Sequence, residues 1–257
     1  MNDHEQLRQD PVLKLLAGQE DLEQPLAGKS TLNRLEPGGR HAGKITFWKQ
    51  GIDELLVNVF IEAHAAAPDQ IVLGLDPTDV ASHGDQEGRF FHGYYDHYCY
   101  LPLYVFSGEH LLCARLRCAH TDASAGSLTE IQRIVEQIRR HWPLVRITLR
   151  GDSGFCRDEL MNWYENHRVD YVFGFARNQR LRSLVADALG QAARQWEQTH
   201  QPARVFVEFL YQTVSGSWSR PRRVVAKAEH IAGKENPRYV VTSLPAEAWP
   251  AQKLYEE

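Results

Sequence analysis

Long apolar runs, an excess of one charge and cysteine are all scarce in this sequence. No apolar stretch approaches the ~20 residues that a membrane-spanning helix needs. The 29 basic and 33 acidic residues give a net charge of −4, which excludes a uniformly basic coat for nucleic acid but not a local basic face. The four cysteines form no CxxC pair, so we expect reduced thiols in a cytoplasmic protein.

Hydrophobic residues make up 43% of the 257 residues, enough for one core or two modest ones. Their periodicity predicts strands separated by helices in the order βββαβαβ, followed by a β-rich part, and therefore a central sheet flanked by helices. Helices are expected at 52–66, 127–141 and around 157–167, strands at 71–76, 98–106, 111–117, 145–150, 171–176 and 238–244, and an antiparallel hairpin with net positive charge at 204–230.

Local signals refine the helix ends. Ser30 is a suitable N-cap for a helix that begins TLNRLE, and PGGRHAG at 37–43 predicts a break. Ser127 and Glu130 have the spacing of a capping box. The helix at 52–66 is expected to bury one stripe, formed by Ile52, Leu55, Leu56, Val59 and Phe60.

Two acidic residues stand at the ends of predicted buried strands. Asp76 closes the apolar run IVLGLD, and Asp152 follows the strand VRITLR and Gly151. Catalytic groups of open α/β sheets gather at the carboxyl ends of strands, and carboxylates there suit Mg²⁺. Two such ions can activate the attacking oxygen and stabilise the leaving oxygen of a phosphodiester. We expect the two carboxyl groups to face one cleft, roughly 4–8 Å apart.

Simpler explanations exist for both acids. Asp76-Pro-Thr-Asp79 also suits a type I turn, and Asp152 suits the cap of the helix after it. The pattern GDSGF at 151–155 is close to the GDSGG of trypsin-like proteases, with Ser153 as nucleophile. The α/β element order and Phe155 in place of the second glycine argue against it.

Two further motifs fit known sites poorly. Aspartyl-phosphate phosphatases need acids two residues apart, whereas Asp76 and Asp79 are three apart. The polar stretch after Asp76, expected as a long loop or hairpin, holds several zinc-type ligands, but their spacing matches no zinc motif and favours ordinary loop residues. These are His83, His92, His97, Asp85 and Asp96.

Several segments in combination resemble bacterial insertion-sequence transposases of the DDE type, most closely the insertion-sequence family numbered 1380. They are LGLDPTDVASHGDQEGRFFHGYYDHYCYLPLYVF, ARLR, ITLRGDSGF, DYVFGFARNQRL and RYVVTSL, with NDHEQLRQDPVLKLLAG and STLNRLE upstream. The resemblance covers nearly the whole chain. It implies an α/β fold with a ribonuclease-H-like mixed sheet flanked by helices, a β-rich insertion and a helical N-terminal lead-in.

The resemblance also implies domain boundaries, which are a helical lead-in at 1–66, a catalytic core at 67–180, the β-rich insertion at 181–237 and a last strand with the start of a C-terminal part at 238–257. Asp76 and Asp152 are then the first and second catalytic acids and hold Mg²⁺ or Mn²⁺.

The implied partner is double-stranded DNA, at the ends of the element and at its target. Whether the protein forms a homodimer is left open, and no membrane is involved. Relatives nick the DNA at the element ends, and the freed 3′-hydroxyl then attacks the target DNA. We expect Arg150, beside the second acid, to contact DNA phosphates. The hairpin turn should add contacts from Arg220, Arg222 and Arg223, and we expect these three side chains to be exposed.

The chain departs from this family at both ends. Family members carry a third acid, a Glu on a helix with a nearby Tyr and Arg, after the equivalent of RYVVTSL. Here the sequence stops at KLYEE, and Glu256 and Glu257 lack the accompanying Arg and Lys, so neither is assigned that role. Relatives also have a segment before the equivalent of Asn2. We therefore expect a fragment that does not transpose DNA by itself. The alternative function is a catalytically inactive remnant that binds DNA or dimerises.

Overall fold

The computed structural model describes residues 4–28, 31, 44–214 and 216–256. The chain divides into two compact units, Met1–Leu55 and Leu56–Glu257. The helix expected to begin at Ser30 and the break expected at 37–43 fall almost wholly outside the described residues. Among the helices that are described, none is both long enough and apolar enough to cross a membrane.

The first unit contains α1 (His4–Leu7), α2 (Pro11–Leu16) and the start of α4 (Lys44–Glu62), which continues into the second unit. Helix α2 begins after an N-cap residue, Asp10. The carboxylate of Asp10 accepts hydrogen bonds from the backbone N–H groups of Val12 at 2.8 Å and Leu13 at 3.1 Å, and a proline occupies the first turn.

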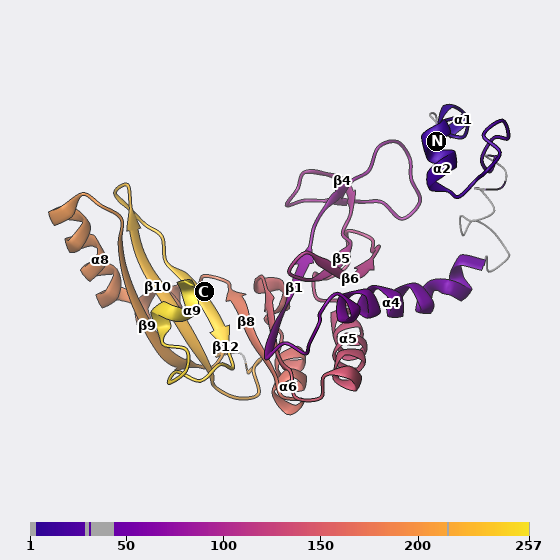
Figure 1. Cartoon of the computed structure of the whole chain (residues 1–257). Helices are drawn as coiled ribbons and strands as arrows, with labels where there is room; N and C mark the ends of the chain where they lie inside the picture. The colour runs from indigo at the N-terminus through magenta and orange to yellow at the C-terminus, as the bar shows by residue number, and fades with distance from the viewer. Residues whose placement is uncertain (1–3, 29–30, 32–43, 215, 257) are drawn as a thin grey trace. The chain divides into compact units, whose positions relative to one another are not determined.

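A nine-stranded mixed sheet forms the body of the second unit (Figure 1). The described strands lie in the order β11-β10-β12-β8-β7-β1-β5-β6, and β9 pairs with β10. Their bounds are β1 (Gln70–Pro77), β5 (Leu103–Ser107), β6 (His110–Arg115), β7 (Arg146–Gly151), β8 (Val169–Phe175), β9 (Ala203–Tyr211), β10 (Arg222–Ile231), β11 (Lys234–Glu235) and β12 (Arg238–Thr242).

The part β6-β5-β1-β7-β8 has the topology expected of a ribonuclease-H-like core. Strands β1, β7 and β8 run parallel, while β5 pairs antiparallel with β1 and β6 pairs antiparallel with β5. Parallel neighbours need crossover connections, and helix α5 (Ser127–His141) and helix α6 (Asp158–Asn166) lie in those connections. The predicted fold class, a mixed sheet flanked by helices, is confirmed.

The hairpin predicted at 204–230 is present but joins the same sheet. Strand β9 pairs antiparallel with residues 222–230 of β10, and β12 lies between β10 and β8. The segment expected as a β-rich insertion at 181–237 begins with two helices that were not predicted, α7 (Gln179–Leu184) and α8 (Ala186–Thr199). Helix α8 contacts β9 and β10.

The two faces of the sheet have different coverings. One face, which we name the core face, carries the apolar side chains of β1, β7 and β8 and packs against α5, α6 and α8. On the opposite face, helix α9 (Ala251–Glu256) packs over β10 and β12 with Leu254 against Val225 and Val240. We name this second face the acid face, because it carries Asp76 and Asp152, as the strand register below establishes.

A second, three-stranded sheet has the order β2-β4-β3 and comprises β2 (Val80–Ala81), β3 (Phe90–His92) and β4 (His97–Tyr100). It occupies the polar stretch after Asp76. Strands β3 and β4 form the hairpin that was one of the two expected forms of this stretch.

Two local predictions are wrong. Val57 and Phe60 are the buried residues of α4 in the second unit, whereas Val59 is 50% exposed, so the buried stripe is rotated from the expected one. The N-cap of α5 is Gly126 with a left-handed backbone, not Ser127 in a capping box. The Glu130 carboxylate instead accepts a hydrogen bond from Arg115 at 2.5 Å, an interaction that is long-range in sequence.

Two adjacent residues of β1 test the assignment of faces. Leu73 is fully buried on the core face, and Val72 is 43% exposed on the acid face. We expect Leu73→Ala to lower the free energy of unfolding by about 2–5 kcal/mol, because it leaves a cavity in the core. Val72→Ala should lower it by less than about 1 kcal/mol. Urea denaturation measures both, and equal losses would contradict the assigned faces.

Candidate functional site

Asp76 lies at the carboxyl end of β1, in the centre of the sheet, and is exposed. Its Oδ2 accepts a hydrogen bond from the hydroxyl of Thr78 at 2.7 Å. Within the described part of the chain, Asp76 makes no ion pair. The hydrogen bond engages only Oδ2, so the other carboxylate oxygen is available to a ligand.

Asp152 follows β7 directly and caps the short 3₁₀ helix η1 (Ser153–Phe155). Its Oδ1 accepts a hydrogen bond from the backbone N–H of Gly154 at 2.8 Å. This is the capping role that was the simpler explanation for Asp152. It engages one oxygen only, the side chain is exposed, and no described cation forms an ion pair with it.

At two glycines, Gly154 and Gly174, atoms of or near Asp152 lie so close to the backbone that they leave little room for a Cβ atom. A Cβ atom at Gly154 would lie 2.9 Å from Asp152 Oδ1 and 2.8 Å from Ala123 Cβ. A Cβ atom at Gly174, on the neighbouring strand β8, would lie 3.2 Å from the backbone nitrogen of Ser153. The glycine at position 154 of GDSGF thus permits the turn that presents this carboxylate.

The strand register places both acids on the acid face. The last recorded pair between β1 and β7 joins Gly74 to Arg150, and Asp76 and Asp152 each lie two residues beyond it. Side chains two residues apart point to the same face, and the backbone of Asp152 is still extended (φ −78°, ψ −173°). The two carboxylates therefore share one face and one edge, as expected. Their separation and their roles stay predictions.

Tyr95 lies close to this edge and packs against the second sheet. Its ring stacks near His97 with centroids 6.1 Å apart, and His97 Nε2 lies 2.8 Å from Asp79 Oδ2. Burial raises the pKa of Tyr95, and the charges of Asp79, Asp152 and Asp76 raise it further. One phenol thus lies within the electrostatic influence of both strand-end acids. No sequence pattern indicates this residue, since one tyrosine in an aromatic loop has no distinctive spacing.

The donor set at this edge suits a hard divalent cation only in part. Two exposed carboxylates on neighbouring strands offer the oxygen ligands that Mg²⁺ and Mn²⁺ take. Among the described residues, no group of three or more His, Cys, Asp or Glu side chains is arranged to hold a metal ion. Asp76 and Asp152 would supply only part of the ligands of such a cation, and the remaining ligands would be water, substrate oxygens or a further residue.

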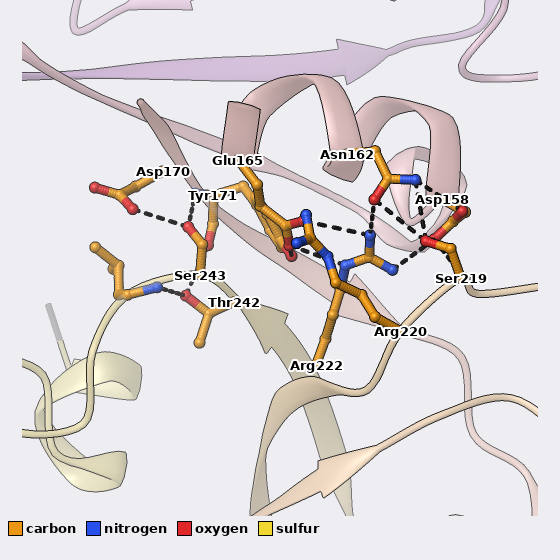
Figure 2. A network of polar contacts seen from close by, with 11 residues as sticks. Asp158, Asn162, Glu165, Asp170, Tyr171, Ser219, Arg220, Arg222, Thr242 and Ser243 are labelled. Atoms are coloured by element: carbon orange, nitrogen blue, oxygen red, sulfur yellow. Dashed lines mark hydrogen bonds and ion pairs between the residues drawn. The ribbon is translucent and has the colours of Figure 1, made fainter. Parts of the chain in front are cut away.

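The predicted exposure of the hairpin arginines is wrong for Arg222 and Arg223. The Arg222 side chain is only 2% exposed, and its guanidinium binds Asp158 at 2.6 Å, Asn162 at 2.8 Å and Glu165 at 2.9 Å, all three on α6 (Figure 2). Arg220, which is about half exposed, also pairs with Glu165. These contacts join the hairpin to the helix that follows the second acid.

Arg223 is also engaged within the protein. It pairs with Glu208 and donates to the backbone carbonyl of Trp249 at 2.7 Å, and its side chain is 13% exposed. Arg150 is exposed on the acid face two residues before Asp152, and no described carboxylate pairs with it. Arg150 therefore remains a candidate for a phosphate contact, and the buried Arg222 does not.

Two of the four cysteines are poor candidates for a nucleophile. All four are free thiols, as predicted, and burial raises the pKa of Cys113 and of Cys156 to about 12. Thiolate is the reactive form, so both are inert near neutral pH.

The family described as transposase DDE domain group 1 matches residues 1–257, and the chain belongs to this family. Members of this family generally use divalent metal ions. No curated protein matches the chain. A solved structure that it matches is the piggyBac transposase synaptic complex with hairpin DNA, at 11% identity and a TM-score of 0.40. The match covers 90% of this chain and 43% of that one, so this chain spans less than half of the other's length.

The contacts of Arg222 with Asp158, Asn162 and Glu165 predict that the stability of the protein depends on the charge at position 222 and on pH. We expect Arg222→Met to lower the free energy of unfolding by about 3–5 kcal/mol, because it leaves Asp158 and Glu165 without their partner. Arg222→Lys should lose less, since it keeps the charge. The matched control is Arg140→Met, which breaks the exposed Arg140–Glu136 pair and should cost at most about 0.5 kcal/mol.

The pH dependence follows from the same contacts. Burial opposes ionisation of Asp158 and Glu165, but hydrogen bonds and the Arg222 charge outweigh it, so the pKa of each carboxyl lies below its ordinary value. Their stabilising contribution is present above the unfolded-state pKa of about 4 and is lost as pH falls through the folded-state value. Urea midpoints between pH 7 and 3 should fall less in Arg222→Met than in the wild type. A parallel fall would contradict the pairing.

Proposed function

We propose that this chain contains the catalytic acids of an insertion-sequence transposase, of the family numbered 1380, that cleaves DNA at element ends and joins the freed 3′ end to a target. One observation carries the proposal. Asp76 and Asp152 end neighbouring parallel strands, share one face, and make no ion pair within the described residues. Two like charges left unneutralised on adjacent strands favour a bound cation.

Each acid has one oxygen engaged and one oxygen available. Thr78 holds the Asp76 carboxylate, and the Gly154 N–H holds that of Asp152, so both are oriented before any ligand binds. Asp76 and Asp152 would hold Mg²⁺ or Mn²⁺, which activates the attacking oxygen and stabilises the leaving oxygen of the phosphodiester when bound. Orientation by these short hydrogen bonds matters, because misplacement by about 1 Å can cost 10²-fold in rate.

The proposed substrate is double-stranded DNA. Arg150 lies on the acid face beside Asp152 and is exposed, so it can bind a phosphate next to the one that reacts. An arginine is suited to this contact because its planar guanidinium can donate two parallel hydrogen bonds to one phosphate.

A second candidate function is a catalytically inactive remnant that binds DNA. The observation that favours it is the incomplete ligand set, since the described residues offer no third carboxylate or imidazole grouped with the pair. The two candidates differ in metal-dependent nicking and agree in DNA binding, so one set of assays separates them.

The test uses substitutions that remove one charge without changing size. Asp76→Asn and Asp152→Asn should each lower Mn²⁺-dependent nicking of element-end DNA by at least about 10²-fold and weaken Mn²⁺ binding in calorimetry. The control is Asp85→Asn, a loop carboxylate that is 97% exposed, which should leave both unchanged.

Three outcomes are informative. Loss in both strand-end variants but not in the control supports the proposal. An Asp152→Asn variant as active as Asp85→Asn would overturn the assignment of the second acid. A wild-type chain that binds element-end DNA without nicking it in Mg²⁺ or Mn²⁺ would establish the second candidate.

A further inference from the structure

Arg117 is a partly buried cation that the proposed chemistry does not use. It ends the segment ARLR and lies two residues after β6. Burial lowers the pKa of its guanidinium, and the charge of Asp122 acts in the opposite direction. Among the described residues, no carboxylate forms an ion pair with Arg117. Its guanidinium donates instead to three backbone carbonyls, those of Leu101 at 2.9 Å, Ala123 at 3.0 Å and Ala125 at 2.9 Å.

The contact with Leu101 holds the strand next to the first acid. Leu101 is buried, and its own N–H donates to the carbonyl of Arg117 at 2.9 Å, so the backbone and the side chain of Arg117 both bind this residue. Two residues further on, β5 begins at Leu103, and Tyr104 of β5 is the register partner of Asp76. Arg117 therefore anchors the start of the strand that pairs with the carboxyl end of β1.

The other two carbonyls belong to the loop that packs against the turn of the second acid. A Cβ atom at Gly154 would lie only 2.8 Å from Ala123 Cβ, so the loop and the turn are in direct contact there. Gly154 is also the residue whose N–H binds the carboxylate of Asp152. The same loop carries Asp122, which pairs with Arg157 at 2.7 Å, just after the turn. Arg117 thus holds a loop that is attached to the Asp152 turn at two points.

The strand pairing alone does not reach the two acids. The recorded pairs of β1 with β7 end at Gly74 and Arg150, two residues before Asp76 and Asp152. Beyond that point, the spacing of the acids depends on the segments that pack around each strand end. One guanidinium joins two of these segments, and its planar group of several N–H donors is suited to binding three carbonyls at once.

We propose that Arg117 is a positioning residue that fixes the spacing between Asp76 and Asp152 by joining the start of β5 to the loop before α5. This inference rests on the proposed function and adds a residue that acts through the neighbours of both acids. Removing a group that holds metal ligands in place typically lowers metal affinity by about 10–100-fold. Loss of Arg117 should therefore weaken the binding of a divalent cation, although Arg117 itself is no ligand.

The test compares two arginines that make the same kind of contact. Arg117→Met removes the three hydrogen bonds and keeps an unbranched side chain. The matched control is Arg139→Met, because Arg139 is also partly buried and donates to two backbone carbonyls, those of His167 at 2.7 Å and Arg168 at 2.8 Å. These carbonyls immediately precede β8, at the edge of the sheet opposite the acids. Calorimetry measures Mn²⁺ binding by the full chain without DNA, and urea denaturation measures its stability.

We expect Arg117→Met to bind Mn²⁺ at least about 10-fold more weakly than the wild type. Arg139→Met should keep the wild-type affinity, although both variants should unfold at lower urea concentrations because each leaves carbonyls without a donor. A lysine pair gives the same comparison with the charge retained. One ammonium group cannot replace the planar fork of Arg117, so Arg117→Lys should bind Mn²⁺ more weakly than Arg139→Lys.

Equal losses of affinity in the two methionine variants would overturn the inference, because general destabilisation would then explain them. Wild-type affinity in Arg117→Met, with Asp76→Asn weakened, would overturn the inference and leave the proposed function intact. A wild-type chain that binds Mn²⁺ no more tightly than Asp76→Asn would overturn both. If Arg117→Met does not fold, the lysine pair decides, and equal affinities of Arg117→Lys and Arg139→Lys would overturn the inference.

Discussion

The parallel pairing of β1 with β7 is the constraint on which the site depends. Because side chains alternate along a strand, one register buries Leu73 and Leu149 on the core face and places Asp76 and Asp152 on the other. A shift by one residue would turn one acid into the core and expose one leucine, and both changes are costly. The hydrophobic core therefore fixes the face on which the two acids lie.

The core and the acid pair were predictable from the sequence because strong local signals agreed. The strand bounded by Asp76, the strand before Asp152 and helix α5 each had a clear apolar pattern, and all three were found within one or two residues. Helix α8 was missed because alanines and Gly190 weaken its apolar stripe. The Ser127 cap was wrong because Glu130 finds stronger partners in Arg115 and Arg133, which no local pattern reveals.

The arginines of the hairpin could not be assigned correctly for a similar reason. A cluster of basic residues in a predicted turn normally indicates a solvated face. Whether its charges are free depends on acids distant in sequence, and here Asp158 and Glu165 on α6 engage Arg222 more than fifty residues away. The position of the hairpin in the sheet was also not predictable from its own residues. Strand β12, which joins the hairpin to β8, follows the hairpin in the chain.

That order has a consequence for how the chain folds during synthesis. Strand β12 is made after the hairpin, yet it supplies the pairing of β8 on one side and of β10 on the other. Until residues 238–242 emerge, β8 has an unpaired edge of seven residues and the hairpin has no sheet to join. Unpaired edges are sites of association between chains. The nascent protein therefore depends on β12 for protection against aggregation, and the pairing of β12 with β8 forms over a long sequence separation.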